Sequence, residues 1–344
     1  MTYYAALDVS LRSVCLCIVN AEGNYCFEGK LPSEVEDIAR CLEGFDGEIE
    51  LVGFEAGMLS QYLSYGLTAA GFNVVCLESH HVKQSLKAMR NKTDRNDARG
   101  ISQLLRTGWY QPVHVKSVES HHVRAMLSSR RVILRKCIDL ENELRGLLRI
   151  FGIKLPSKLS HGAFDEVVRK PIEANPALTR ALLPMLDLRG TLYGAYMKLD
   201  KEVRAMAHED AVCRRFMTVP GVGAITALTF KAGVDDPTRF KNSRLVGAHF
   251  GLTPKRHQSG EVDYDGRISR AGDAEVRCAL YVAAHVLVTR HSEWSSLKAW
   301  GVRLTRTKGH RKATIAVARK LAVILHRMWI DDTDFRWHAE NRAA

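Results

Sequence analysis

The amino-acid sequence predicts an α/β fold in its N-terminal third and a mainly all-α fold in the remainder. Up to about residue 115, short apolar runs typical of strands alternate with helical patterns, whereas the later segments are mainly helical in periodicity. The charge balance changes at the same point. Residues 1–115 hold 10 Lys+Arg against 14 Asp+Glu, which leaves 40 against 24 for the rest of the 50 and 38 in the chain. The 344 residues allow two or three domains of about 100–200 residues each.

The N-terminal elements follow one another in a recognisable order. Residues 3–20 are expected to form two strands joined by a short turn, and residues 23–31 a third antiparallel strand. The next expected elements are a helix at 34–42, a strand at 49–57, a helix at 58–71, a strand at 72–79 and a helix at 93–108. This order matches the ribonuclease H-like layout, a mixed sheet with helices packed on it. Helices on both faces explain why the strands are nearly continuously apolar.

Four carboxylates stand out in this region. Asp8 and Glu55 end buried strands, where a charge is costly unless water or a cation compensates it. Asp94 and Asp97, three residues apart, share one face near the start of a helix. The helix dipole alone could account for that pair. Together the four carboxylates favour a divalent cation, because magnesium prefers oxygen ligands.

The middle of the chain is expected to form two long helices. Residues 117–152 form an amphipathic pattern in which Leu127, Leu134 and Leu148 repeat at multiples of seven. A looser segment follows, and a second helix is expected over about residues 186–210. Two such helices indicate an antiparallel coiled coil that could serve dimerisation, spacing of two catalytic parts, or both.

The segment 216–230, "FMTVPGVGAITALTF", resembles a helix-hairpin-helix element. Its turn contains Gly221 and Gly223, and a helix is expected from Ala224. Glycines let a backbone approach a phosphate closely, and a helix N-terminus supplies free N–H donors. A plain turn between two helices is the simpler interpretation.

A serine lies between two arginines further on, in "GRISRAGD", ahead of a helix expected to begin near Asp273. Arg267 and Arg270 suit a phosphate, but Ser269 needs activation to act as a nucleophile, and a solvated loop serine is the ordinary interpretation. A basic loop with Arg306, Lys308, His310, Arg311 and Lys312 is expected before a final helix.

The composition points to a polyanionic partner in the cytoplasm. The basic surplus of residues 116–344 favours nucleic acid, with improved solubility as the alternative. No apolar run reaches the about 18 residues of a membrane helix, and the N-terminus has no signal-peptide pattern. The eight cysteines contain no CxxC pair, as expected for a reduced, cytoplasmic protein.

Several long stretches together resemble one family. They are "LDVSL", "FEAG", "NKTDRNDARG", "TGWYQPVHVKS", "RGLLRIFG", "VPGVGAITAL", "HFGLTPKRHQSGE", "GRISRAGD" and "RKLAVILHRMW". The sequence resembles the bacterial insertion-sequence transposases of the IS-one-ten family and its IS-eleven-eleven group. It departs from the family pattern at Gly57, where Thr is common, and at Arg270, where Lys is common. Neither departure puts an active enzyme in doubt.

The resemblance implies a RuvC-like Asp-Glu-Asp-Asp domain (residues 1–117), a coiled coil (118–210) and a serine-bearing transposase domain (211–344). It implies Asp8, Glu55, Asp94 and Asp97 as catalytic ligands of Mg²⁺ (or Mn²⁺) and Ser269 as nucleophile. The implied partners are target and donor DNA, a non-coding bridge RNA, and further subunits in dimers or tetramers with composite active sites. The implied setting is the bacterial cytoplasm, at the nucleoid when the enzyme acts, and not a membrane. The expected nucleic-acid contacts are Lys92, Arg95, Arg99, Gly221, Gly223, Lys255, Arg256, Arg267, Arg270, Lys308, Arg311 and Lys312.

The leading functional hypothesis is therefore RNA-guided recombination of DNA strands through a phosphoserine intermediate. A metal-dependent nuclease or junction resolvase that uses water, with Ser269 merely structural, is the first rival. A nucleic-acid-binding protein that keeps the fold without catalysis is the second, and the intact carboxylate set argues against it.

Overall fold

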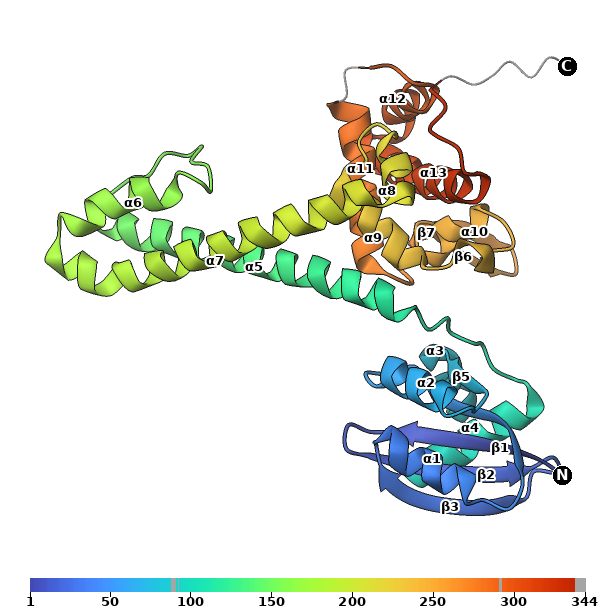
Figure 1. The fold of residues 1–344 in the computed structure, drawn as a ribbon. Helices are drawn as coiled ribbons and strands as arrows, with labels where there is room; N and C mark the ends of the chain where they lie inside the picture. The colour runs from blue at the N-terminus through green and yellow to red at the C-terminus, as the bar shows by residue number, and fades with distance from the viewer. Residues whose placement is uncertain (88–90, 92, 291–292, 338–344) are drawn as a thin grey trace, which may run out of the picture. The chain divides into compact units, whose positions relative to one another are not determined.

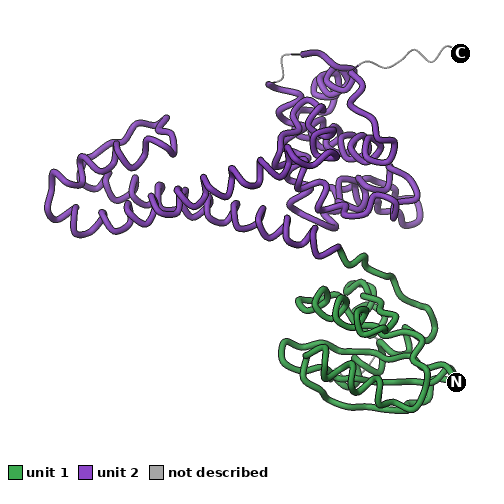
Figure 2. Tube along the Cα trace, viewed as in Figure 1, with its two compact units in different colours: residues 1–116 green, residues 117–344 purple. Residues whose placement is uncertain are grey.

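The computed structural model describes residues 1–87, 91, 93–290 and 293–337. The chain divides into two compact units, residues 1–116 and residues 117–344 (Figure 2). The first boundary lies one residue from the predicted one. The boundary predicted at residue 210 does not divide the structure.

Unit 1 is built on a five-stranded mixed sheet. Its strands are β1 (Thr2–Val9), β2 (Ser13–Asn20), β3 (Tyr25–Pro32), β4 (Glu48–Glu55) and β5 (Val74–Leu77), in the order β3-β2-β1-β4-β5. The first three strands pair antiparallel, and β4 and β5 extend the sheet in parallel from β1. The mixed sheet and its ribonuclease H-like strand order confirm the predicted fold.

Helices cover both faces of this sheet (Figure 1). On one face, Leu7 and Phe54 share a buried cluster with Ile38 of α1 (Val35–Glu43) and Leu63 of α2 (Ser60–Ala69). On the other face, Ala6 shares a cluster with residues of α4 (Asp94–Thr107). A short helix not anticipated from the sequence, α3 (Ser79–Leu86), begins where the Glu78 side chain caps its first turn.

Two long helices of unit 2, α5 (Val118–Ile150) and α7 (Pro176–Glu209), lie side by side (Figure 1). They are antiparallel, because Leu148 near the end of α5 is buried with Leu178 near the start of α7. The helix α7 begins ten residues earlier than expected, since Asn175 caps it and Pro176 suits its first turn. The segment expected to be loose contains α6 (Phe164–Glu173). Side-chain interdigitation of coiled-coil type stays a prediction.

The rest of unit 2 is mostly helical, which confirms the expected class. Its core contains residues from α5 and α7, such as Leu127 and Val203, beside Phe216 and Leu321. This shared core joins residues 118–210 to the remainder and explains why they form one unit. The helices are α8 (Ala211–Met217), α9 (Ala224–Val234), a 3-10 turn η1 (Pro237–Arg239), α10 (Arg244–His249), α11 (Ala274–Thr289), α12 (Ser296–Lys308) and α13 (His310–Asp331).

One local expectation in this region was wrong, and one element was not anticipated. The basic segment 306–312 is not a loop: α12 runs to Lys308, Gly309 breaks the helix at φ 79°, and α13 begins at His310. Residues 254–268, for which no element was predicted, form a two-stranded hairpin of β6 (Pro254–Ser259) and β7 (Val262–Ile268). The two-residue connection with Gly260 at positive φ was a hairpin signal in the sequence.

No helix in the described part of the chain is long and apolar enough to cross a membrane.

Candidate active site

Asp8 and Glu55 lie next to each other at the carboxyl ends of two neighbouring parallel strands. Leu7 of β1 is paired with Phe54 of β4, and each carboxylate is the next residue along its strand. Side chains alternate between the faces of a sheet. Asp8 lies two residues after Ala6, and Glu55 two residues after Gly53, so both carboxylates point to the face that carries α4. A side chain at Gly53 would meet the Leu105 side chain of α4 at 2.4 Å, which confirms that this face is closely covered.

Asp94 and Asp97 lie in the first turn of α4, on the same side of the sheet. Thr93 caps this helix by accepting a hydrogen bond from the Asn96 amide. Ala98, one residue further, is buried against Cys17 of β2 and therefore holds this end of α4 over the sheet.

The Cys15 thiol is affected by the charges of one strand carboxylate, Asp8, and one helix carboxylate, Asp94. It is the register partner of Asp8 on β2. Burial raises the pKa of the Cys15 thiol, and the charges of Asp94 and Asp8 raise it further. Both carboxylates therefore lie near one thiol.

The donor set fits a divalent cation, although the side chains are not gathered into a complete ligand cage. Among the described residues, no three His, Cys, Asp or Glu side chains are close enough to hold a metal ion together. Mg²⁺ is usually bound by only one or two carboxylates, with water and substrate phosphate completing its octahedron. The adjacent Asp8 and Glu55 are suited to supply that pair.

Two of the cations beside the acidic start of α4 have a structural role that the sequence did not suggest. Lys92 lies outside the described residues. Arg95 and Arg99 both bind Glu28 of β3, with Arg95 Nε 3.0 Å from Glu28 Oε2 and Arg99 Nη2 2.9 Å from the same oxygen. The Arg99 guanidinium also lies 4.9 Å from the centre of the Tyr25 ring. In this structure the two arginines thus fasten the first turns of α4 to the edge of the sheet.

This attachment should make the N-terminal unit sensitive to acid. Hydrogen bonds from Arg99 and Arg95 lower the pKa of Glu28 to about 2. A carboxylate with a lowered pKa stabilises the fold above its unfolded pKa of about 4.3, and that contribution is lost as the pH falls towards 2. Wild-type α4 should exchange its amide hydrogens more slowly than α4 of Glu28→Gln at pH 6, and the difference should shrink below about pH 4.

Hydrogen exchange at several pH values, read by mass spectrometry on peptides covering residues 93–108, measures this difference. Glu22→Gln, a change at an exposed carboxylate, serves as the control. Equal protection of α4 in Glu28→Gln and wild type at pH 6 would contradict the role given to Glu28.

Ser269 lies directly after β7 in a turn with little freedom. Its amide donates to the Thr253 carbonyl at 2.8 Å. The next residue, Arg270, has φ 57°, a backbone conformation that residues other than glycine rarely adopt. Such backbone outliers are concentrated at functional sites.

Two glycines allow the backbone to close around this turn. A side chain at Gly251 would meet the Ala271 amide at 2.3 Å, and one at Gly272 would meet the His249 carbonyl at 2.1 Å. Arg277 of α11 donates to the carbonyls of Phe250 and Ala271, at 3.1 and 2.9 Å, and so ties the two segments together. Ser269 is therefore presented from a rigid support rather than a mobile loop.

The turn between α8 and α9 packs closely against α11. Gly221 has φ 85°, and a side chain there would meet the Ala283 carbonyl of α11 at 2.4 Å. Its lack of a side chain is thus required for packing against a helix, and the predicted contact of Gly221 with a phosphate stays a prediction. Gly223 precedes α9, and space beside it is open.

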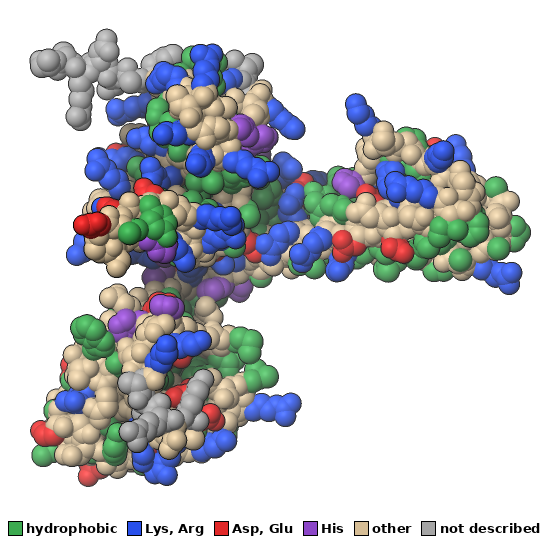
Figure 3. Space-filling model, turned by 180° about the vertical axis from the view of Figure 1, so that it is seen from behind, with side chains coloured by type: hydrophobic (Ala, Val, Ile, Leu, Met, Phe, Trp, Pro, Cys, Tyr) green, Lys and Arg blue, Asp and Glu red, His purple; other side chains and the backbone are tan. Residues whose placement is uncertain are grey.

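The remaining expected contacts are basic side chains at the surface of unit 2. Arg256 forms an ion pair with Asp263 across the hairpin. Figure 3 shows that Lys and Arg side chains are spread widely over one face of this unit, with fewer Asp and Glu among them. The exposed members of the predicted set are Lys255, Arg256, Arg267, Arg270, Lys308, Arg311 and Lys312.

Models of known protein families match two parts of this chain. Residues 5–153 match the model DEDD_Tnp_IS110, described as a transposase, and residues 213–299 match a model described as "Transposase IS116/IS110/IS902 family". A transposase for insertion sequence element IS1111A of Coxiella burnetii is 30% identical over 263 residues, which are 74% of this chain and 71% of that protein. A probable family 20 transposase of Pseudomonas aeruginosa is 27% identical over 292 residues, 83% and 86% of the two chains.

A solved structure, T. thermophilus RuvC in complex with Holliday junction substrate, matches 33% of this chain and 100% of its own at 15% identity, with a TM-score of 0.25. That score is too low to support an argument, so the fold assignment rests on the strand order itself.

Fold and family matches together define a transposase with a ribonuclease H-like carboxylate domain, a class of enzyme that acts on DNA and for which divalent metal use is implied in general. The chain belongs to the IS116/IS110/IS902 transposase family, whose insertion-sequence members it resembles along most of its length.

Proposed function

We propose that this transposase cuts and rejoins DNA strands through a covalent phosphoserine on Ser269, with the carboxylate set of unit 1 at the scissile phosphate. The main support is the juxtaposition of Asp8 and Glu55, in adjacent register positions on the face that carries α4. The rigid turn around Ser269 adds to it. A nucleophile must be held in place to be effective, and glycine-dependent backbone packing holds this one.

In the proposed reaction, the Ser269 hydroxyl oxygen attacks the scissile phosphorus. The bond from phosphorus to the 3′ oxygen breaks, and a proton passes overall from serine to the departing 3′-hydroxyl. The exchanged strand's 3′-hydroxyl then attacks the phosphoserine and regenerates Ser269. One phosphodiester is replaced by another, so no nucleotide hydrolysis is needed, in keeping with the absence of a GxxxxGK[ST] sequence.

A divalent ion, Mg²⁺ or Mn²⁺, supplies positive charge to the scissile phosphate when bound. Asp8 and Glu55 would hold it, with Asp94 and Asp97 completing the acidic set. Arg267 and Arg270, on either side of Ser269, are suited to hold the phosphate oxygens.

The proposal extends to guidance by an RNA that bridges target and donor DNA, and to dimers or tetramers with composite sites. The family resemblance supports both, and the basic surplus of residues 116–344 supports a nucleic-acid partner in general. Contacts of Gly221, Gly223 and the exposed basic residues with phosphate belong to the same proposal.

A nuclease that uses water is the second candidate. One observation favours it: the Ala271 amide lies 3.4 Å from the Ser269 hydroxyl, so this serine could simply cap its own turn. In that case the carboxylates alone would perform hydrolysis and leave free ends.

A suicide DNA substrate distinguishes these candidates. Its cleaved strand is lost by diffusion, so that a covalent adduct accumulates and is seen as a shifted band in a denaturing gel. Wild-type protein with the guide RNA and Mg²⁺ should form the adduct, Ser269→Ala should not, and Asp97→Ala should form far less. Ser129→Ala, a change at an exposed helical serine, should match wild type. Free ends that persist in Ser269→Ala would instead identify the water-using nuclease.

A further inference from the structure

The β6–β7 hairpin exposes both of its strands almost completely. Every residue of β6 is exposed, and so are Val262 to Asp265 and Arg267 of β7. Within the described part of the chain, these two strands form a sheet of their own. Because its residues are exposed, the hairpin can bind a ligand on its surface. A two-stranded hairpin is marginally stable alone, so such a ligand would also stabilise it.

One face of the hairpin carries a stacked aromatic pair. His257 and Tyr264 are register partners, and their rings are 5.1 Å apart with an interplanar angle of 24°. Tyr264 is 56% exposed, although it is part of this stack. Gly266 follows on the same face and adds no side chain, so the imidazole beside it is not covered from that side.

The charges of the hairpin differ between its two faces. Lys255 lies two residues before His257 on β6, at an irregularity in the register with β7. Arg256 is on the face opposite His257, where it is neutralised by Asp263. An exposed ring pair thus lies close along the strand to an exposed cation, and β7 ends one residue before Ser269.

We propose that this aromatic face, formed by His257 and Tyr264 with Lys255 close along the strand, binds unpaired bases of the DNA strand that is joined to Ser269. This inference rests on the proposed function. Flat aromatic rings stack on any base, and a neighbouring cation meets the backbone phosphate, which together give binding that tolerates sequence. A protein partner fits less well. Stable protein interfaces bury about 800 Å² on each side, which is more than the His257–Tyr264 pair and the exposed Val262 provide.

The binding test uses the full-length chain carrying Ser269→Ala, in the absence of divalent metal, so that no strand is cut by serine or by water. The probe is a gapped DNA duplex with 2-aminopurine, whose fluorescence is quenched by stacking, at the unpaired positions. Tyr264→Val removes the ring but keeps a residue with high strand preference, so that the hairpin is retained. We expect it to weaken binding about 5-fold to 100-fold and to abolish the quenching.

Two further variants complete the design. Tyr264→Phe keeps the ring and should restore both affinity and quenching. Gln258→Ala changes an exposed residue on the opposite face and should behave as the parent protein does. A fully paired duplex of the same length should show much less dependence on Tyr264 than the gapped one.

Unchanged affinity and quenching in Tyr264→Val would overturn the proposal, as would an equal loss in Gln258→Ala. A change in sedimentation of Tyr264→Val with unaltered DNA binding would also overturn it, because the face would then be a contact between copies of this chain. The suicide-substrate adduct is scored separately with native Ser269. An adduct without any effect of Tyr264 defeats the hairpin proposal alone, and a Tyr264 effect without an adduct defeats the phosphoserine alone.

Discussion

Replacing Asp8 with asparagine is expected to lower the rate of DNA strand cleavage by about 10³-fold while leaving the sheet of unit 1 intact. Asparagine preserves the shape of the side chain at the end of β1, so the register with β2 and β4 should persist. It removes one of two adjacent charges suited to hold a divalent ion. Loss of several kcal/mol of charge stabilisation in the transition state corresponds to about a thousandfold in rate.

The measurement is single-turnover cleavage of labelled DNA over a range of Mg²⁺ and Mn²⁺ concentrations. The concentration of metal that gives half-maximal activity should rise in Asp8→Asn, and likewise in Glu55→Gln. Asp46→Asn changes an exposed aspartate in the same unit and serves as the control. If Asp8→Asn cleaves DNA at the wild-type rate and with the wild-type metal requirement, Asp8 does not belong to the active site.

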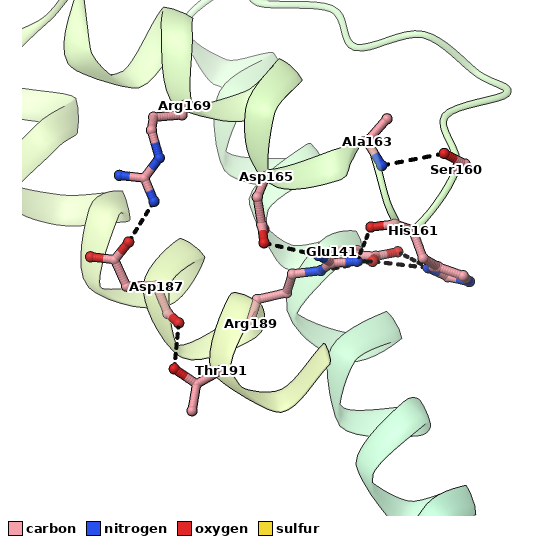
Figure 4. A network of polar contacts seen from close by, with 9 residues as sticks. All are labelled: Glu141, Ser160, His161, Ala163, Asp165, Arg169, Asp187, Arg189 and Thr191. Atoms are coloured by element: carbon pink, nitrogen blue, oxygen red, sulfur yellow. Dashed lines mark hydrogen bonds and ion pairs between the residues drawn. The ribbon is translucent and has the colours of Figure 1, made fainter. Parts of the chain in front are cut away.

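Replacing Arg189 with methionine is expected to destabilise unit 2 by about 3–5 kcal/mol, because it would leave a buried carboxylate without its cation. Arg189 is fully buried and Glu141 of α5 is only 8% exposed at its side chain. Arg189 Nε donates to Glu141 Oε1 at 2.9 Å, and Nη1 forms an ion pair with Asp165 Oδ2 at 3.1 Å. Figure 4 shows how this network joins α5, α6 and α7.

A neighbouring pair gives a matched control for this prediction. Arg169 also binds a carboxylate, with Nη2 2.7 Å from Asp187 Oδ1, but the two side chains are 39% and 56% exposed. Arg169→Met should therefore cost about 1 kcal/mol or less. Urea denaturation followed by circular dichroism measures both changes.

A second variant tests whether the loss of stability in Arg189→Met arises from the buried, unpaired carboxylate of Glu141. Replacing Glu141 with leucine together with Arg189→Met removes Arg189 and the more buried of its two carboxylate partners at once, and should recover much of the lost stability. If the double variant is no more stable than Arg189→Met, the loss arises from packing instead. The Arg189 guanidinium lies 4.6 Å from the Tyr193 ring centre, so packing contributes to its environment.

The elements of unit 1 were predictable because their signals are local. Alternating and continuous apolar runs identified the five strands, and the spacing of Ile101, Leu104 and Leu105 identified α4. The short helix α3 was missed because only its N-terminal cap at Glu78 distinguishes it. The start of α7 was misplaced because Asn175-Pro176 was read as part of a loose segment rather than as a helix start.

The sequence supplied the residues of the candidate site but not the contacts that hold the surrounding segments in place. The identities of Asp8, Glu55, Asp94, Asp97 and Ser269 came from the sequence and its family resemblance. Glu28 was missed, because its partners Arg95 and Arg99 are 67 and 71 residues away and no local pattern connects them. Arg277, which ties the serine turn to Phe250, was missed for the same reason.

The sequence by itself determined the order of the five strands of unit 1, the family, and the residue types of the candidate site. These properties depend on short periodic patterns and on residue types, which are visible in any stretch of the chain. Only the tertiary structure decided that Glu28 holds the arginines beside Asp94, that Gly221 serves helix packing, and that residues 118–210 share a core with the serine-bearing part. Each of these depends on contacts between segments far apart in the chain, whose formation follows from the packing of the whole unit rather than from any local preference.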